Sequence, residues 1–284
     1  MQLELSIVVP MYNEAQNVAA LVQETSSVLR GRAFELLLVD DGSHDATLGE
    51  ALRLSHELPQ LRVLQHPRRY GQSAALYTGV SASRAAWIVT LDGDCQSDPR
   101  DIGVLLAARD AAGDERVRLV MGNRTRRQDG AWRALQGRVA NHVRARLLGD
   151  DTPDGACGIK LFARDTYLVL PRFDHMHRFL PVLFLRSGAR VISVAVRHRP
   201  RVAGASKYGM LNRLGAGIVD LGGVMWLGRR HLTLRDVVEI GPVRRDAERL
   251  PASEPSSPPD AERTVELHGA NAFVPAVLAP WSNE

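Results

Sequence analysis

The sequence predicts an α/β fold built around a mostly parallel sheet. Short apolar, β-branched runs alternate with segments whose apolar residues recur at helical spacing through the first half of the chain. Strands that alternate with helices indicate βαβ units, in which successive strands run parallel. Polar residues also follow several of the apolar runs directly, as expected where the carboxyl ends of parallel strands form a ligand-binding edge.

The first strand is expected over residues 5–9, a β-branched run that ends at Pro10. A helix follows over residues 16–30, where valines and leucines recur at helical spacing. The apolar run 35–39 predicts a second strand, which leads directly into Asp40. These three elements make up a first βαβ unit.

The alternation continues with a helix over residues 46–57, a strand over 61–65 and a helix over 72–84. A fourth strand is expected to end at Asp92. Ligands of open α/β sheets bind at the carboxyl ends of the strands. We therefore expect the polar residues after the first, second and fourth strands to converge on one crevice.

The second half of the chain is less regular. Strands are expected over residues 119–122 and 191–196, and an arginine-rich helix over 132–148. Residues 211–227 predict an amphipathic helix, although four glycines weaken it. Residues 242–284 hold seven of the 15 prolines, so this tail is expected to be disordered.

Positive charge is unevenly distributed, although the formal net charge is only +4. Residues 115–150 hold nine arginines against three acids, and residues 197–213 hold four arginines and one lysine without an acid. Such clusters suit phosphate groups, a membrane surface or nucleic acid, and the alternative is a solvated face. Aromatic residues make up only 5% of the chain and do not interleave with the arginines, which argues against a nucleic-acid binder.

Cys95 and Cys157 are the only cysteines, which fits a reducing compartment rather than a disulfide framework. The N-terminus lacks the basic region and the long apolar run of a signal peptide. No stretch has the length and composition of a transmembrane helix, and the nearest one, residues 214–228, is interrupted by Asp220 and several glycines. The sequence therefore predicts a cytoplasmic protein without a transmembrane helix.

Asp92 and Asp94 stand at the end of the fourth strand, followed by the amide of Gln96. Carboxylate oxygens suit Mg²⁺ or Mn²⁺, and Mg²⁺ usually binds one or two carboxylates together with substrate phosphates. Cys95 is expected to point into the core, because these ions prefer oxygen. Two aspartates at this spacing are also common in loops and helix N-caps, so the pair alone does not decide the chemistry.

Seven landmarks follow one another along the chain. They are VVPMYNE at 8–14, VDDGS at 39–43, glycines at 71 and 79, LDGDCQ at 91–96, GNR at 122–124, DGACG at 154–158 and GASKYG at 204–209. With these motifs the chain resembles the inverting glycosyltransferases of family 2 with the GT-A fold, in the polyprenyl-phosphate branch typified by dolichol-phosphate mannose synthase. The run RQDGAWR at 127–133 is also similar to bacterial undecaprenyl-phosphate aminoarabinose transferases.

The resemblance implies a GT-A fold, a mixed, mostly parallel sheet flanked by helices, that binds a GDP- or UDP-linked sugar. The residues that it implies in donor binding follow the first, second and fourth strands, and are Pro10, Tyr12, Glu14, Asp40, Asp41 and Asp92. It further implies Asp92, Asp94 and Gln96 as ligands of Mg²⁺ or Mn²⁺, which neutralises the departing nucleoside diphosphate.

The acceptor implied by the resemblance is a polyprenyl phosphate, dolichyl or undecaprenyl. This phosphate is already ionised, so the reaction needs neutralisation of two anions more than a general base, and arginine binds phosphate bidentately. The landmarks place the acceptor-phosphate contacts at Arg124, Arg133, Arg201, Ser206 and Lys207. Asp154 would orient the sugar or the phosphate, with a turn role as the alternative. Arg126, Arg127 and Arg138 are weaker candidates.

Three parts are expected: a catalytic domain over residues 1–200, an acceptor-phosphate loop with an amphipathic helix over 201–241, and the tail over 242–284. The helix carries Trp226 and basic neighbours, which suits peripheral contact with the cytoplasmic face of a membrane. A core helix packed on the sheet is the alternative.

Two rival functions remain at this point. A transferase that adds sugar to a saccharide would need a carboxylate base near the acceptor hydroxyl, and Asp154 is the only obvious candidate. A sugar nucleotidyltransferase would need a glycine-rich basic loop near the N-terminus, and residues 10–14 do not form one.

Overall fold

The computed structural model describes residues 2–124, 146–150, 152, 154–155, 157–200 and 210–230. The chain divides into two units, Met1–Thr233 and Leu234–Glu284, and all of the described residues belong to the first. Most of the helix expected over 132–148 and the whole proline-rich tail lie outside the described residues. The three expected parts of the chain stay a prediction.

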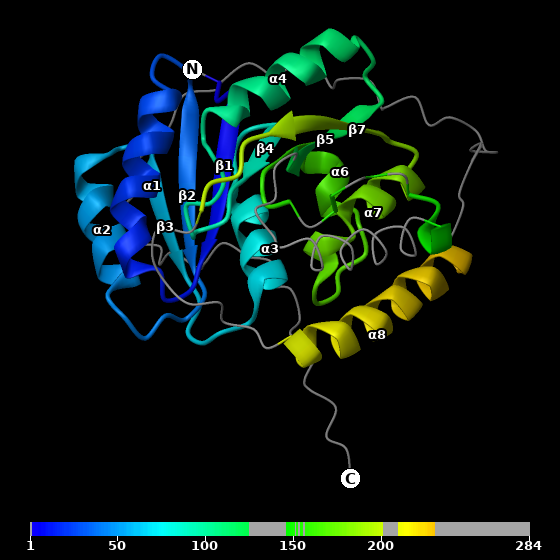
Figure 1. The fold of residues 1–284 in the computed structure, drawn as a ribbon. Helices are drawn as coiled ribbons and strands as arrows, with labels where there is room; N and C mark the ends of the chain where they lie inside the picture. Colours follow the sequence, from blue (N-terminus) through cyan, green and yellow to red (C-terminus); the bar gives the residue numbers. More distant parts are fainter. Residues whose placement is uncertain are drawn as a thin grey trace, which may run out of the picture. The chain divides into compact units, whose positions relative to one another are not determined.

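The expected α/β fold is confirmed, with a seven-stranded sheet of order β3-β2-β1-β4-β6-β5-β7 (Figure 1). The strands are β1 (Leu5–Met11), β2 (Phe34–Asp40), β3 (Leu61–Gln65), β4 (Trp87–Thr90), β5 (Val117–Arg124), β6 (Lys160–Ala163) and β7 (Arg190–Val196). Among the described strands β6 runs antiparallel to its neighbours β4 and β5, and the other pairings are parallel. The order of the strands reverses between β1 and β4, the point at which such sheets form a ligand crevice.

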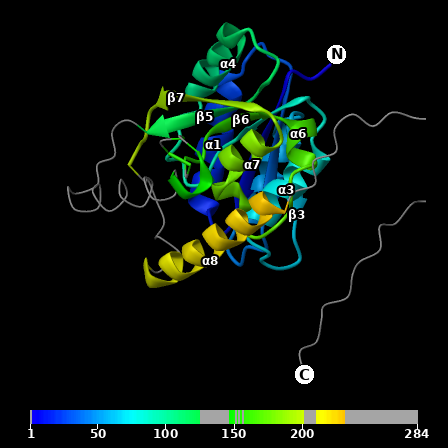
Figure 2. The ribbon, with the colours of Figure 1, turned by 90° about the vertical axis from the view of Figure 1, so that its right-hand side faces the viewer.

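Helices cover both faces of the sheet. Residues of α1 (Ala15–Val28), α2 (Thr47–Glu57) and α4 (Asp101–Ala112) pack into one apolar cluster. The second cluster takes residues from α3 (Gln72–Ala82), α6 (Arg164–Leu168), the 3₁₀ turn η1 (Met176–Arg178), α7 (Leu180–Arg186) and α8 (Met210–Arg229). Figures 1 and 2 show α3, α6 and α7 on the same side of the sheet as α8.

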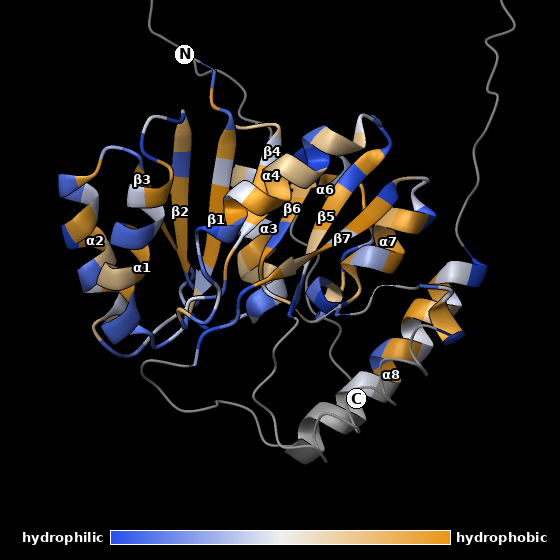
Figure 3. Cartoon of the chain, turned by 45° about the horizontal axis from the view of Figure 1, so that its top comes forward, coloured by the Kyte–Doolittle hydropathy of each residue, from blue (hydrophilic) through white to orange (hydrophobic). Residues whose placement is uncertain are grey.

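Alternate residues of the central strands point to opposite clusters. Ile7 and Val9 of β1 belong to the first cluster, and Val8 between them belongs to the second. A strand that is buried on both faces reads as a mostly apolar run, and Figure 3 shows β1 and β2 as mostly apolar, with a hydrophilic band in β2. Apart from the helix expected over 132–148, the strands and helices predicted from sequence begin and end within two residues of those observed, whereas β6, α4, α6 and α7 were not predicted.

One side of α8 is packed and another is exposed. Val224 is 1% exposed, and the Nη1 atom of Arg186 donates to its carbonyl oxygen at 2.7 Å. Val219 and Trp226 are 74% and 59% exposed. Among the described helices, none combines the length and apolar character needed to cross a membrane.

The amino end of α3 is fixed by a half-buried imidazole, that of His177. Ser73 Oγ lies 2.8 Å from His177 Nδ1, so the hydrogen bond joins α3 to η1. Burial lowers the pKa of His177 well below its usual range, and the nearby cations of Lys160 and Arg178 act in the same direction. The ring is therefore neutral in the folded protein at pH 7.

We predict a loss of stability in mild acid that originates at His177. Its pKa is lowered by folding, so the unfolded chain takes up a proton below about pH 6.5 that the folded chain does not. Stability should then fall as the pH drops from 7.5 to 5.5, and His177→Asn should flatten this dependence although it weakens the fold at pH 7.5. Urea unfolding at the two pH values measures both effects.

The matched control for this prediction is His56→Gln, because His56 is exposed on α2. The control should keep the wild-type dependence of stability on pH. An unchanged dependence in His177→Asn would show that the His177 imidazole is not its source.

Candidate active site

The polar residues predicted to act together lie at one edge of the sheet. The carboxyl ends of the parallel strands and the amino end of β6 share this edge, because β6 alone is antiparallel. The registers show this directly, since Met11 at the end of β1 pairs with Asp40, and Thr90 at the end of β4 pairs with Lys160.

Asp92 is held on several sides. The Nε2 atom of Gln72, the first residue of α3, donates to Asp92 Oδ1 at 3.0 Å. The backbone of Gly158 lies so close that a β-carbon there would be 1.9 Å from Asp92 Oδ2. Burial of the carboxyl group and the nearby Asp94 raise the pKa of Asp92, while Lys160, Arg124 and Gln72 oppose the shift.

The chain turns sharply after Asp92. Asp94 Oδ1 accepts a hydrogen bond from the backbone N–H of Gln96 at 3.2 Å, and the Gln96 amide group donates to the Arg199 carbonyl oxygen at 3.4 Å. Cys95 between them has a φ of +58° and directs its thiol to the carbonyl oxygen of Asn17, 3.6 Å away. Burial raises the pKa of this thiol to about 11. Cys95 therefore belongs to the core, as expected.

Asp92 and Asp94 fit a hard divalent cation. Burial and then the repulsion from Asp94 raise the pKa of Asp92, and a divalent cation would relieve that repulsion. Within the described residues no three His, Cys, Asp or Glu side chains form a group that could hold a metal by themselves. Two carboxylates completed by phosphate oxygens and water are the usual set for Mg²⁺.

The last residue of β5, Arg124, forms a half-buried ion pair. Arg124 donates from Nε and Nη2 to the two carboxylate oxygens of Asp154, at 2.7 and 2.8 Å. The hydrogen bonds that Arg124 donates to this carboxylate raise the pKa of Arg124, so the pair stays charged. A guanidinium carries five N–H donors, of which this pair takes two.

Lys160, the first residue of β6, brings a further charge into the interior and is only 5% exposed. Its ammonium group donates to the carbonyl oxygen of Cys157 and interacts with Asp92. Burial lowers the pKa of Lys160, whereas Asp92 and Asp154 raise it. The described charges around Asp92 thus include two cations, Arg124 and Lys160.

The two aspartates after β2 have different surroundings. Asp40 accepts the backbone N–H of Ser43 at 3.3 Å. Asp41 accepts the backbone N–H groups of Tyr70 and Gly71, each at 2.8 Å, and its Oδ1 lies 2.8 Å from His66 Nδ1. Asp41 therefore fixes the turn that leads into α3, whose first residue holds Asp92.

The donor-binding candidates after β1 lie next to this turn. The Arg69 guanidinium lies over the Tyr12 ring, with Cζ 4.4 Å from the ring centre. Glu14 accepts the side-chain amide of Asn17 at 2.6 Å. The backbone oxygen of Pro10 lies beside Gly93, where a β-carbon would be 3.1 Å away. Pro10 and Glu14 thus border the turn between β4 and α4, and Tyr12 lies against Arg69 in the segment before α3.

Several sequence-predicted residues lie outside the described residues and stay predictions. These are Arg133, Arg201, Ser206 and Lys207, with the weaker candidates Arg126, Arg127 and Arg138. Two residues near Asp92 were not predicted at all, Gln72 and Lys160. For Lys160 the signal was available as a lysine inside the apolar run Ile-Lys-Leu-Phe, whereas nothing in the sequence distinguishes Gln72.

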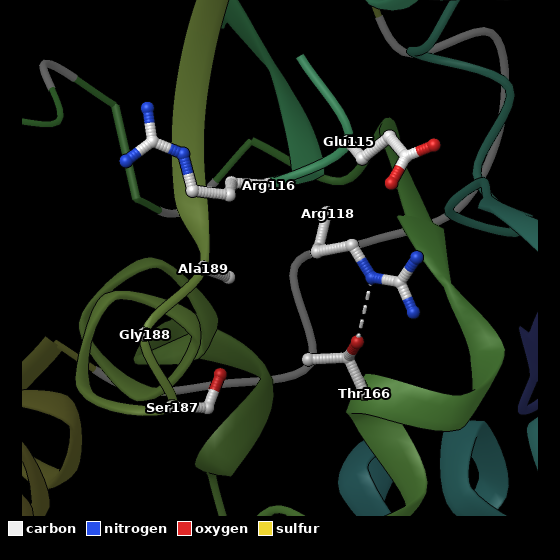
Figure 4. A pocket seen from close by; sticks show the side chains of 7 residues that line it. All are labelled: Glu115, Arg116, Arg118, Thr166, Ser187, Gly188 and Ala189. Atoms are coloured by element: carbon white, nitrogen blue, oxygen red, sulfur yellow. Dashed lines mark hydrogen bonds between the residues drawn. The ribbon is translucent and has the colours of Figure 1, made fainter.

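The structure also has a pocket of about 250 Å³ away from this edge (Figure 4). It lies beside the amino ends of β5 and β7 and is lined by Glu115, Arg116, Arg118, Thr166, Ser187, Gly188 and Ala189. The Nε atom of Arg118 donates to Thr166 Oγ1 at 3.1 Å, and Arg118 also pairs with Asp165. Its two arginines are engaged by carboxylates, since Arg116 pairs with Asp114.

Comparison with known sequences decides the family. The sequence profile described as Glycosyl transferase family 2 matches residues 6–168, a stretch that contains most of β1, all of β2, and Asp92, Asp94 and Asp154. The chain belongs to this family. It is a glycosyltransferase, and its sheet and flanking helices form the GT-A-like fold that the resemblance implied.

This chain is similar in sequence to transferases whose names contain a polyprenyl phosphate and a sugar. It is 36% identical over 233 residues to the dodecaprenyl-phosphate galacturonate synthase of Rhizobium johnstonii, covering 80% of this chain and 68% of that protein. It is 31% identical over 212 residues to the undecaprenyl-phosphate 4-deoxy-4-formamido-L-arabinose transferase of Edwardsiella ictaluri, covering 73% of this chain. The chain spans only 63% of the latter protein's length.

Solved structures support the fold. Glucosyl-3-phosphoglycerate synthase from Mycobacterium tuberculosis, in complex with Mn²⁺, uridine diphosphate and glucosyl-3-phosphoglycerate, aligns with a TM-score of 0.57 at 20% identity, over 80% of this chain and 79% of that chain. A mannosyltransferase from Pyrobaculum calidifontis in complex with GDP-Man and Mn²⁺ aligns with a TM-score of 0.59 at 20% identity, over 78% and 64%.

We predict that Gly158→Ala weakens metal binding at this edge. The new β-carbon would displace the Asp92 carboxylate, and losses of about tenfold or more in metal affinity are usual when ligands lose their support. Titration of Mn²⁺ in the presence of UDP, and separately of GDP, measures the affinity.

Gly103→Ala is the matched control, because Gly103 lies in α4 with nothing within 4 Å of its added β-carbon. It should bind Mn²⁺ as the wild type does and be equally or more stable, since alanine favours a helix. A Gly158→Ala protein with wild-type affinity would contradict the close approach to Asp92.

Proposed function

We propose that this glycosyltransferase moves a sugar from a GDP- or UDP-linked donor to a polyprenyl phosphate, with inversion at the anomeric carbon. The proposal rests on the edge of the sheet at which Asp92 and Asp94 lie near two cations, the half-buried Arg124 and the buried Lys160. Transfer to a phosphate acceptor requires carboxylates that hold a metal ion on the donor diphosphate. It also requires cations that offset the negative charge of the acceptor phosphate. The names of the related transferases support the same substrate class.

Asp92 and Asp94 would hold Mg²⁺ or Mn²⁺, with Gln96 as a further candidate ligand, and the chemistry the ion supplies is charge neutralisation on the departing diphosphate. The acceptor phosphate is ionised at neutral pH, so its oxygen attacks the anomeric carbon without a base. The bond from that carbon to the diphosphate breaks in the same step, which inverts the configuration. Arg124 would offset the charge of the incoming phosphate.

The contacts of Asp154 argue against transfer to a saccharide hydroxyl. That reaction needs a carboxylate base, and Asp154 is the candidate that the sequence offers. Both of its oxygens accept hydrogen bonds from Arg124. A carboxylate engaged in this way is a weak base, since the guanidinium stabilises its ionised form. A phosphate acceptor makes no such demand on Asp154, which would serve to orient Arg124.

Peripheral contact with a membrane through α8 belongs to the same proposal. A polyprenyl phosphate resides in a lipid bilayer, and the exposed side of α8 carries Trp226 and Val219, with exposed Arg229 and Arg230 at its end. A helix with apolar residues, a tryptophan and basic neighbours suits the interface of an anionic membrane.

Asp94→Ala should abolish transfer. Loss of one carboxylate removes charge stabilisation of the leaving diphosphate, and we expect turnover to fall by about a thousandfold. The assay follows transfer of radiolabelled sugar from the nucleotide donor to undecaprenyl phosphate. Asp110→Ala, which removes an exposed aspartate of α4 paired with Arg109, should keep wild-type turnover. Turnover of the wild-type size in Asp94→Ala would refute the assignment of the metal site.

Trp226→Ser should reduce binding to anionic vesicles. The exposed indole is the largest apolar group on α8, and its loss removes most of the apolar contact that an interfacial helix uses. Flotation with vesicles that contain phosphatidylglycerol measures the bound fraction. Leu52→Ser, at a leucine of α2 that is 45% exposed, provides the control and should float as the wild type does. A wild-type protein that does not float with these vesicles would contradict the proposed membrane contact.

A further inference from the structure

The segment that directly follows Asp94 is hydrogen-bonded to a segment about a hundred residues further along the chain. The two segments are residues 96–101, which follow β4, and residues 197–199, which follow β7 (Figure 1). The Arg199 N–H donates to the Gln96 carbonyl oxygen at 2.9 Å, and Ser97 and His198 form an isolated antiparallel bridge. Strands β6 and β5 separate β4 from β7 in the sheet, so this contact reaches across the edge of the site.

Buried charges reinforce the junction. Asp98 is 1% exposed, and its oxygens lie 2.6 Å from Arg100 Nη2, 3.0 Å from Arg199 Nη2 and 3.7 Å from Arg197 Nη1. The Asp101 carboxylate accepts two hydrogen bonds from Arg197, one from its backbone N–H at 2.7 Å and one from its side-chain Nε at 2.9 Å. We call Asp98, Asp101, Arg197 and Arg199 the Asp98 clasp.

The Asp98 clasp connects the loop that carries the proposed metal ligands with the segment that leads to a predicted acceptor-phosphate residue. On one side, Asp98 follows Asp94 by four residues, and the Gln96 side chain is hydrogen-bonded to the backbone of Arg199. On the other side, Arg199 precedes Arg201 by two residues, and the sequence predicts Arg201 as an acceptor-phosphate contact. Arg199 also donates to Glu24 of α1 at 2.7 Å, which anchors the clasp to the body of the domain.

We propose that Asp98 is a positioning residue that holds the loop of Asp92 and Asp94 in register with the segment leading to Arg201. It would act through Arg199 and the Gln96 backbone, without contact with substrate. This inference rests on the proposed function for its acceptor side, while its metal side depends only on Asp92 and Asp94.

The test is Asp98→Asn, which keeps the shape of the side chain and removes its charge. We expect the Kd for Mn²⁺, measured in the presence of UDP or GDP, to rise about tenfold, as is usual when a partner behind the metal ligands is lost. The KM for undecaprenyl phosphate should rise by a similar factor, with kcat at saturation little changed. Binding of the same nucleotide without metal should stay at the wild-type level.

Asp114→Asn is the matched control, because Asp114 also pairs with two arginines, Arg116 and Arg190, but at the amino ends of β5 and β7. It should leave the Kd for Mn²⁺ and the acceptor KM unchanged. Asp98→Glu, which restores the charge, should recover part of both losses. If Asp98→Asn does not fold, Arg199→Gln breaks the same contact from its more exposed side and should give the same two shifts.

A purely structural role would lower the melting temperature and the active fraction, yet leave the Kd for Mn²⁺ and the acceptor KM of the folded protein unchanged. That result would overturn the proposal. If the wild type does not use undecaprenyl phosphate at all, the proposed function fails, and the titration of Mn²⁺ still decides whether Asp98 positions the metal loop.

Discussion

The pairing of β6 between β4 and β5 is the interaction on which the geometry of the site depends. It places the amino end of an antiparallel strand at the edge where parallel strands end, so Lys160 stands opposite Thr90 and next to Asp92. The Thr90 hydroxyl donates to the Gly158 carbonyl oxygen at 2.8 Å, which draws the chain before β6 against the end of β4. Because Gly158 has no side chain, the Asp92 carboxylate has room beside it.

The same edge shows how a carboxylate can serve the fold rather than a ligand. Asp41 holds the backbone of the turn before α3, and Gly42 lets that turn pack closely, since a β-carbon would be 2.5 Å from the Arg68 carbonyl carbon. This turn places Gln72, the first residue of α3, where its side chain donates a hydrogen bond to Asp92. A donor pocket at this edge would therefore owe its shape to Asp41 even where Asp41 makes no contact with the nucleotide.

The sequence allowed the alternating strands and helices of the first half to be predicted, because β1 and β2 are buried on both faces and contain the apolar runs Ile7–Val9 and Leu36–Val39. It also predicted Asp92, Asp94, Arg124 and Asp154 as site residues, and the structure places these side chains near one another. It did not reveal β6, since four residues that begin with a lysine lack any strand pattern. Gln72 and Asp98 escaped notice for a different reason: their partners lie 20 and 101 residues away, and only the folded chain brings them together.

The charges around Asp92 have a consequence for the order in which ligands can enter. Asp92 and Asp154 are matched by Lys160 and Arg124, two anions against two cations, with Asp94 in addition. The sum of these charges is negative, so a free diphosphate would be repelled, whereas a metal ion that comes with it offsets its charge, and unpaired charge is costly in a partly desolvated site. Arrival of the two as one complex nearly cancels this unpaired charge. This edge of the sheet is thus better suited to binding the metal ion and the diphosphate as one preformed complex than to binding them one after the other.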